Sequence, residues 1–180
     1  MGFETFSFLA RKLPSFKVSG SQIRIIHEPS TFYNELVTRS ESSKERIIMS
    51  ALYWGVEDRE RRLRDVIASS LSSKTNLRVK ILLDWCRGTR MVRGESSSTL
   101  LRPLHDHAPS PGQCKLGFYQ TPQLRGWLKR ILPSKWNELI GLQHIKVYIF
   151  DDSVIISGAN LSQDYFTNRQ VQSKLPKSIC

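Results

Sequence analysis

Hydrophobic positions along the chain follow two different periods, and these periods alternate. Short apolar runs that are typical of β-strands occur at 22–26, 46–52, 77–84 and 115–120. Apolar side chains at helical spacing, with polar residues on the opposite face, occur at 29–40, 58–71 and 123–132. Strands that alternate with helices predict an α/β layered domain, with a mixed β-sheet flanked by helices.

The two ends of the chain and one internal stretch lack this regular pattern. Residues 1–20 are expected to be a separate, frayed N-terminal segment, and residues 171–180 a divergent tail without periodicity. Between 86 and 112 the chain is polar and contains glycine, and only 97–104 is expected to form one or two helical turns. The domain itself is therefore predicted to span residues 21–170.

A predicted hairpin in the last third of the chain carries unusual polar residues. The runs 142–150 and 154–157 are expected to pair as strands. Because side chains alternate along a strand, His144 and Lys146 share one face. The opposite face is apolar and is expected to enter the core: Ile145, Val147 and Ile149.

An imidazole beside an ammonium group suits reactions at phosphorus. Imidazole attacks phosphorus or moves a proton near neutral pH, and a neighbouring lysine holds phosphoryl oxygens and offsets their charge. The hairpin is followed by Gly158, which suits a tight strand-to-helix turn. Either Ser157 or Asn160 is expected to cap the helix predicted at 161–168. Backbone N–H groups at such a helix start favour an anion, so this turn is predicted to close the phosphate pocket.

The spacing of these residues fits a specific signature. His144, Lys146 and Asp151 match H-x-K-x-x-x-x-D, and Gly158 and Asn160 follow where a Gly-x-Asn element is expected. This is the signature of the phospholipase D superfamily. Four stretches further resemble the N-terminal half of the eukaryotic phosphatidylglycerophosphate synthase family: "IRIIHEP", "LLDWCRGTR", "TPQLRGWLK" and "GLQHIKVYIFDDSVIISGANLSQDYFTNRQ". The resemblance covers most of residues 20–170.

The resemblance implies an activity. Members of this family transfer a phosphatidyl group from CDP-diacylglycerol to glycerol 3-phosphate and release CMP, on the route to cardiolipin, without a metal or another cofactor. One signature histidine attacks phosphorus to form a phosphohistidine, and a histidine from a second signature donates and accepts protons. By this resemblance His144 supplies one of these roles, while Lys146 and Asn160 bind phosphate oxygens. Asp151 completes the catalytic signature, although aspartate at the start of a hairpin turn is also common for local reasons.

Only one such signature is present in the sequence. His27, His105 and His107 begin no second H-x-K pattern, and Val171 stands where the resemblance leads us to expect an acid that orients the nucleophilic imidazole. The chain is therefore expected to be a truncated form, inactive alone, that needs a second signature half or a homodimer. Two alternatives stay open, namely a single-signature phosphodiesterase such as a dimeric nuclease, and a non-catalytic lipid-binding fragment.

Charge and amphipathicity favour an anionic partner. The formal net charge is +11, which suits nucleic acid, an anionic membrane or a phosphorylated substrate, and the resemblance favours the membrane over nucleic acid. Helix 123–132 is basic and contains Trp127, a pattern shared by interfacial helices and ordinary surface helices. Arg87, Arg90 and Arg93 follow the strand at 77–84 and are expected either to contact the nucleotide pyrophosphate or to lie on a solvated loop. The resemblance places the protein in the mitochondrion, peripheral to the inner membrane.

Overall fold

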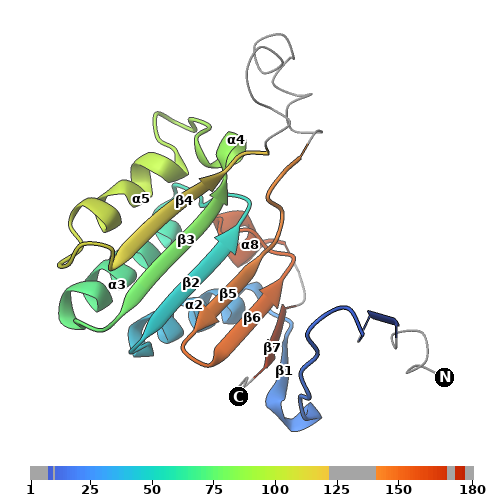
Figure 1. Ribbon diagram of the computed structural model, residues 1–180. Coiled ribbons are helices and arrows are strands. Elements are labelled where there is room, and N and C mark those ends of the chain that lie inside the picture. The colour runs from blue at the N-terminus through green and yellow to red at the C-terminus, as the bar shows by residue number, and fades with distance from the viewer. Residues whose placement is uncertain (1–7, 10, 122–140, 170–172, 177–180) are drawn as a thin grey trace.

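The computed structural model describes residues 8–9, 11–121, 141–169 and 173–176, the last four by their backbone alone (Figure 1). Helix 123–132 and Val171, to which sequence analysis assigned roles, lie outside the described residues. The described part of the N-terminal segment, up to residue 22, is almost entirely exposed and contains one short 3-10 helix, η1 (Gly20–Gln22).

A seven-stranded mixed sheet forms the centre of the molecule (Figure 1). Its strands lie in the order β1-β7-β6-β5-β2-β3-β4. Their bounds are β1 (Ile23–Ile26), β2 (Arg46–Ala51), β3 (Arg78–Asp84), β4 (Cys114–Tyr119), β5 (Val147–Phe150), β6 (Ser153–Ser157) and β7 (Ser173–Pro176). This arrangement confirms the predicted α/β class with a mixed sheet.

The strand directions give the sheet two chemically different ends. Strands β2, β3 and β4 are parallel, β5 runs antiparallel to β2, and β6 runs antiparallel to β5. Therefore β2, β3, β4 and β6 all finish at the end where β5 begins, which we call the carboxyl end of the sheet. In open α/β sheets this is where ligands bind.

Four helices pack on one face of the sheet (Figure 1). They are α2 (Pro29–Ser42), α3 (Asp58–Ser73), α5 (Ser97–Asp106) and α8 (Gln163–Thr167). Their apolar stripes meet the inward residues of the strands in one core, which includes Phe32, Leu63, Ile67, Met49 and Tyr148. No described helix covers the opposite face, where Leu82 and Ile156 are exposed.

The structure corrects the predicted orientation of the hairpin. The strand is shorter than expected: β5 begins at Val147, so His144 and Lys146 lie in the segment that precedes it. The register pairs Tyr148 with Met49, whose side chain is fully buried, so Tyr148 also points into the core and its ring packs against Phe32. Lys146 is therefore buried on the core side together with Tyr148, whereas His144, in the segment before β5, is exposed. Ile145, Val147 and Ile149, which were expected to enter the core, are exposed or only partly buried.

Three further expectations change in detail. Residues 173–176, predicted to lie in a tail, form β7, which pairs with β1 and β6 inside the sheet, because its backbone N–H and C=O groups find partners on both neighbouring strands whatever the period of its side chains. Helix α5 is longer than the predicted one or two turns, and its start is capped by Ser96, whose Oγ accepts from the backbone N–H of Thr99. The short helix α4 (Trp85–Gly88) was not predicted.

Candidate active site

The structure brings most of the predicted site residues to the carboxyl end of the sheet. His144 and Lys146 lie just before β5, and Gly158 and Asn160 lie just after β6, which ends at Ser157. These two segments run side by side, since the backbone N–H of Ser157 donates to the carbonyl of Lys146 at 3.3 Å. Convergence of the His144, Lys146 and Asn160 side chains on one phosphate stays a prediction.

Lys146 is a buried cation without a carboxylate partner among the described residues. Its side chain is 5% exposed, and its ammonium group donates to the carbonyl of His144 at 3.0 Å. Burial lowers the pKa of Lys146 below its ordinary value. The His144 side chain, by contrast, is exposed to solvent. A buried ammonium that lacks a countercharge is suited to hold an incoming anion.

The turn after β6 is tightly built and keeps one amide oxygen available. Ser157 Oγ accepts from the backbone N–H of Ala159 at 2.9 Å, and the Tyr148 hydroxyl donates to the Ala159 carbonyl at 3.0 Å. Asn160 is buried, yet its Oδ1 has no hydrogen-bond partner among the described residues. Ser157 or Asn160 was expected to cap α8, but the N-cap position is occupied by Ser162.

A buried carboxylate, that of Asp84, holds the segment that carries His144 and Lys146 in place. The carboxylate of Asp84, at the end of β3, accepts from the backbone N–H groups of Arg87 (3.0 Å) and Gln143 (3.2 Å). The Gln143 side-chain amide in turn donates to Ser50 on β2 and to the Ile145 carbonyl at 3.2 Å. Asp84 and Gln143 therefore tie the residues before β5 to two other strands. Sequence analysis missed both, because only pairing across the sheet brings them together.

Asp151, the third member of the signature, lies at the opposite end of β5. Its carboxylate accepts from the backbone N–H groups of Lys44, Glu45 and Arg46, each at 2.9 Å. Burial raises the pKa of Asp151, but these hydrogen bonds and the Arg46 charge outweigh burial and lower the pKa below its ordinary value. Its backbone has a positive φ of 48°, which aspartate tolerates in turns. This geometry separates Asp151 from the other signature residues.

Arg87 and Arg90 line a cavity of about 250 Å³ at the carboxyl end of the sheet. The same cavity is lined by Tyr53, after β2, and by Ser162 at the start of α8. Tyr53 and Ser162 are joined by a hydroxyl–hydroxyl hydrogen bond of 3.2 Å. The two arginines therefore line the same cavity as the segment that follows Asn160.

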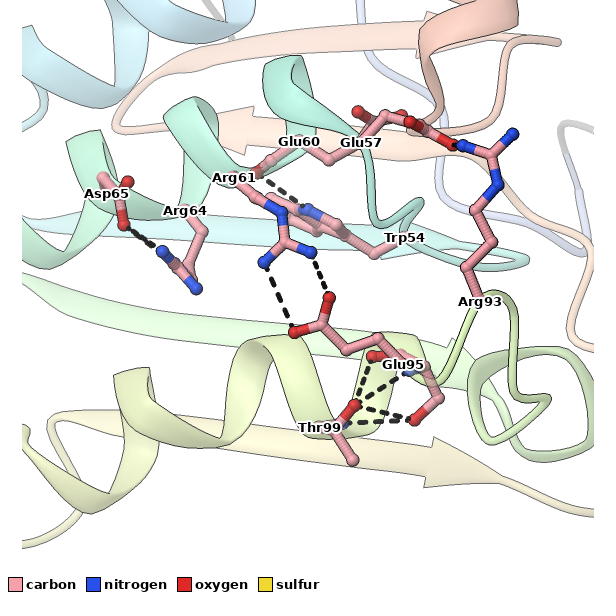
Figure 2. Close-up of polar contacts among 10 residues, drawn as sticks. Trp54, Glu57, Glu60, Arg61, Arg64, Asp65, Arg93, Glu95 and Thr99 are labelled. Carbon is pink, nitrogen blue, oxygen red and sulfur yellow. Dashed lines mark hydrogen bonds and ion pairs between the residues drawn. The ribbon is translucent and has the colours of Figure 1, made fainter.

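Glu60 on α3 fixes the position of α8, a role that sequence analysis missed because no local pattern indicates it. Its carboxylate accepts from the backbone N–H of Gln163, while burial raises the pKa of Glu60. A Cβ at Gly55 would collide with this carboxylate, so a larger residue there would force the Glu60 side chain to move. Trp54 packs beside it and donates its indole N–H to the Glu60 carbonyl at 3.2 Å (Figure 2).

The fold defines the class of protein. It is phospholipase D-like: a phosphatidylserine synthase from Haemophilus influenzae superposes with a TM-score of 0.76 and 21% sequence identity, over 97% of this chain and 37% of that chain. NucT from Helicobacter pylori matches with a TM-score of 0.58 and 17% identity, over 85% of this chain and 83% of its own. These likenesses confirm the predicted fold.

Sequence similarity to named proteins indicates which phospholipase D-like family the chain resembles. Over 175 residues the chain is 42% identical to the mitochondrial CDP-diacylglycerol–glycerol-3-phosphate 3-phosphatidyltransferases of Gallus gallus and Homo sapiens, matching 94% of this chain and 31% of each relative. The Schizosaccharomyces pombe enzyme is 45% identical over 157 residues. No family model matches the chain. The resemblance to this phosphatidyltransferase family is confirmed, and the chain spans about a third of the length of these relatives.

None of the helices in the described residues has the length and apolar character needed to cross a membrane. Within the same residues, no three His, Cys, Asp or Glu side chains are grouped closely enough to hold a metal ion.

Proposed function

We propose that this chain forms one half of an active site that transfers a phosphatidyl group from CDP-diacylglycerol to glycerol 3-phosphate and releases CMP. The observation that carries the proposal is the buried Lys146 ammonium beside His144, at the carboxyl end of the sheet and without a described carboxylate partner. The names of the relatives suggest the reaction, and the buried ammonium supports a phosphate-binding role for Lys146.

The first step is attack on phosphorus. A nitrogen of His144 forms a bond to the phosphorus of the phosphatidyl group, and the bond from that phosphorus to the CMP oxygen breaks. A second histidine, which this chain does not provide in a signature, donates a proton to the departing CMP. Lys146 offsets the negative charge that builds on the non-bridging oxygens.

The second step returns the enzyme to its first state. The second histidine takes the proton from a hydroxyl of glycerol 3-phosphate, and that oxygen attacks the phosphorus while the bond to His144 breaks. Because the two histidines are chemically alike, His144 and its partner can also exchange these two roles. Either way, each histidine ends the cycle in its initial protonation state.

The other residues bind and position the substrate. The Asn160 amide and the backbone N–H of Gly158 hold oxygens of the transferred phosphate. Arg87 and Arg90 hold the second phosphate of the CDP group from the cavity that they line. Asp151 acts as a positioning residue, because it fixes the turn that joins β5 to β6 and touches no reacting atom.

A complete site needs a second signature half, from another segment or from a second copy of this chain. We place the complete enzyme in the mitochondrion, at the surface of the inner membrane, since vertebrate relatives are named mitochondrial and the lipid substrate resides in a bilayer. A site with one histidine lacks the proton transfer that is worth roughly 10²–10⁴-fold in rate.

The test is CMP release from CDP-diacylglycerol with glycerol 3-phosphate in detergent. We expect no release from the purified chain, and release when it is mixed with the region of a relative that lies beyond the matched residues. His144→Ala should abolish the restored release. Restored release that survives this substitution would exclude His144 from the chemistry. Robust release by the chain alone, lost in His144→Ala, would instead establish a self-complementing dimer.

A further inference from the structure

The loop of residues 89–96, which joins α4 to α5, has a fixed shape. Val92 and Glu95 pair through two backbone hydrogen bonds of 2.7 and 3.1 Å. Between them Arg93 and Gly94 both have positive φ, 52° and 85°, as in the two-residue turns of tight hairpins. A non-glycine residue in this conformation is uncommon, and the surrounding contacts must hold it there.

Ion pairs fasten this loop to helix α3 (Figure 2). Glu95 receives both guanidinium N–H groups of Arg61, one of them at 3.3 Å. Arg93 pairs with Glu57, which immediately precedes α3, at 2.9 Å. The capping interaction of Ser96 with Thr99 anchors the far side of the loop to α5. The loop is thus braced on both sides, unlike an ordinary surface connection.

This braced loop holds apolar side chains out in solvent. Met91 is 59% exposed and Val92 is 48% exposed, and Trp85 in the preceding α4 is also partly exposed. Single exposed apolar residues are ordinary, but a fixed tip that displays two neighbouring ones is typical of an interaction surface. Exposed arginines, Arg90 and Arg93, stand on either side of the two apolar residues.

The loop also forms a wall of the cavity described above. Val92 lines that cavity together with Arg87, Arg90 and Ser162, and Ser162 is two residues after Asn160. An apolar tip between arginines, beside this cavity at the carboxyl end of the sheet, complements the surface of an anionic bilayer. The apolar side chains match acyl chains, and the guanidinium groups match lipid phosphates.

We infer that the 89–96 loop is the part of the protein that enters the interface of an anionic phospholipid bilayer. Met91 and Val92 insert below the headgroups, and Arg93 binds headgroup phosphates. A lipid headgroup then reaches the carboxyl end of the sheet beneath the loop. This inference rests on the proposed function only for the identity of the lipid that is drawn in, because docking itself requires no chemistry.

Sedimentation with vesicles tests the inference. The probes are phosphatidylcholine vesicles with and without phosphatidylglycerol. Met91→Ser/Val92→Ser should lower the partition coefficient of the chain on anionic vesicles by about tenfold or more, because two apolar side chains lose their insertion. The matched control is Ile25→Ser/Ile156→Ser, which removes apolar side chains of similar exposure, 48% and 54%, from the outer sheet face. The control should bind like the unaltered chain.

A third variant measures the electrostatic contribution to vesicle binding. Arg93→Ser should weaken binding to anionic vesicles by about fivefold and leave binding to neutral vesicles unchanged. Equal losses in the loop and control variants, or no loss in the loop variant, would overturn the inference, as would a chain that binds neither kind of vesicle. Thermal unfolding of each variant checks that the fold is kept.

The same assay separates this inference from the proposed function. His144→Ala leaves the loop intact and should bind vesicles like the unaltered chain, while losing the restored CMP release. Normal vesicle docking with no restored CMP release from the unaltered chain would refute the proposed function alone. Restored CMP release in detergent, with a loop variant that still docks normally, would refute the docking loop alone.

Discussion

The two ends of β5 hold polar side chains under opposite conditions. At its start Lys146 is buried without a described carboxylate, and nearby Asn160 Oδ1 and Gln143 Oε1 lack hydrogen-bond partners among the described residues. Past its end, the Asp151 carboxylate accepts three backbone N–H groups. Burying polar groups without partners costs stability, whereas full pairing stabilises. The signature therefore has two parts. Lys146 has polar groups around it that are unpaired among the described residues and is suited to bind a ligand (the unsatisfied end), whereas Asp151 is fully hydrogen-bonded and stabilises the fold (the satisfied end).

The largest effect is expected at the unsatisfied end. Lys146→Met keeps the length of the side chain and removes a buried charge, so the affinity of the chain for CDP should fall about 10- to 100-fold, as for a lost charge-assisted hydrogen bond. The free energy of unfolding should stay the same or rise by about 1 kcal/mol, as when strain stored at a functional site is released. Calorimetric titration and chemical denaturation measure the two quantities. A variant that unfolds more easily yet binds CDP normally would make Lys146 a structural residue.

At the satisfied end the expected effect is on stability. Asp151→Ala leaves three backbone N–H groups without their acceptor and should lower the free energy of unfolding by about 1–2 kcal/mol. Its neighbour offers a matched control, because Asp152 forms only an exposed ion pair with Arg46 at 3.2 Å. Asp152→Ala should change stability by less than about 0.5 kcal/mol. Equal losses from both substitutions, measured by denaturation, would contradict the assignment.

A smaller effect is expected in the pH dependence of stability. The folded-state pKa of Asp151 lies below its ordinary value, so its contribution is present above the unfolded pKa and is lost as the pH falls through the folded pKa. The stability difference between the unaltered chain and Asp151→Ala should therefore shrink as the pH is lowered below about 4. Denaturation curves across acidic pH measure this. A difference that stays constant down to the lowest pH at which the chain folds would rule out the ionised carboxylate as the cause.

Local sequence patterns predicted most of the elements that place the site. The apolar runs marked β2, β3 and β4 within one or two residues, and Pro29 marked the start of α2. The signature spacing located His144, Lys146 and Asn160, and the structure places all three at one end of the sheet. These features depend on periods and turn residues a few positions apart, which a single sequence displays directly.

Other parts of the site depend on contacts between distant segments. The hydrogen bond from the Gln143 N–H to Asp84 joins the segment before β5 to the end of β3, and Glu60 reaches the backbone of Gln163 from another helix. Strand β7 lies between β1 and β6, although its own sequence shows no period. The brace between Arg61 and Glu95 likewise links residues that no local pattern relates. Such pairs are invisible in one sequence because they are chosen by packing.

The sequence by itself predicted that His144 and Lys146 share a face, since alternation along an extended chain is a matter of backbone geometry. It did not determine which face. Apolar residues occupy both sides of β5, so the period alone permits either orientation. Only the tertiary structure decided it: Tyr148 pairs with the buried Met49 and packs on Phe32, and this register draws Lys146 to the rim of the core. A buried ring gains more from leaving water than the half-buried aliphatic face does, and the cation follows it inward.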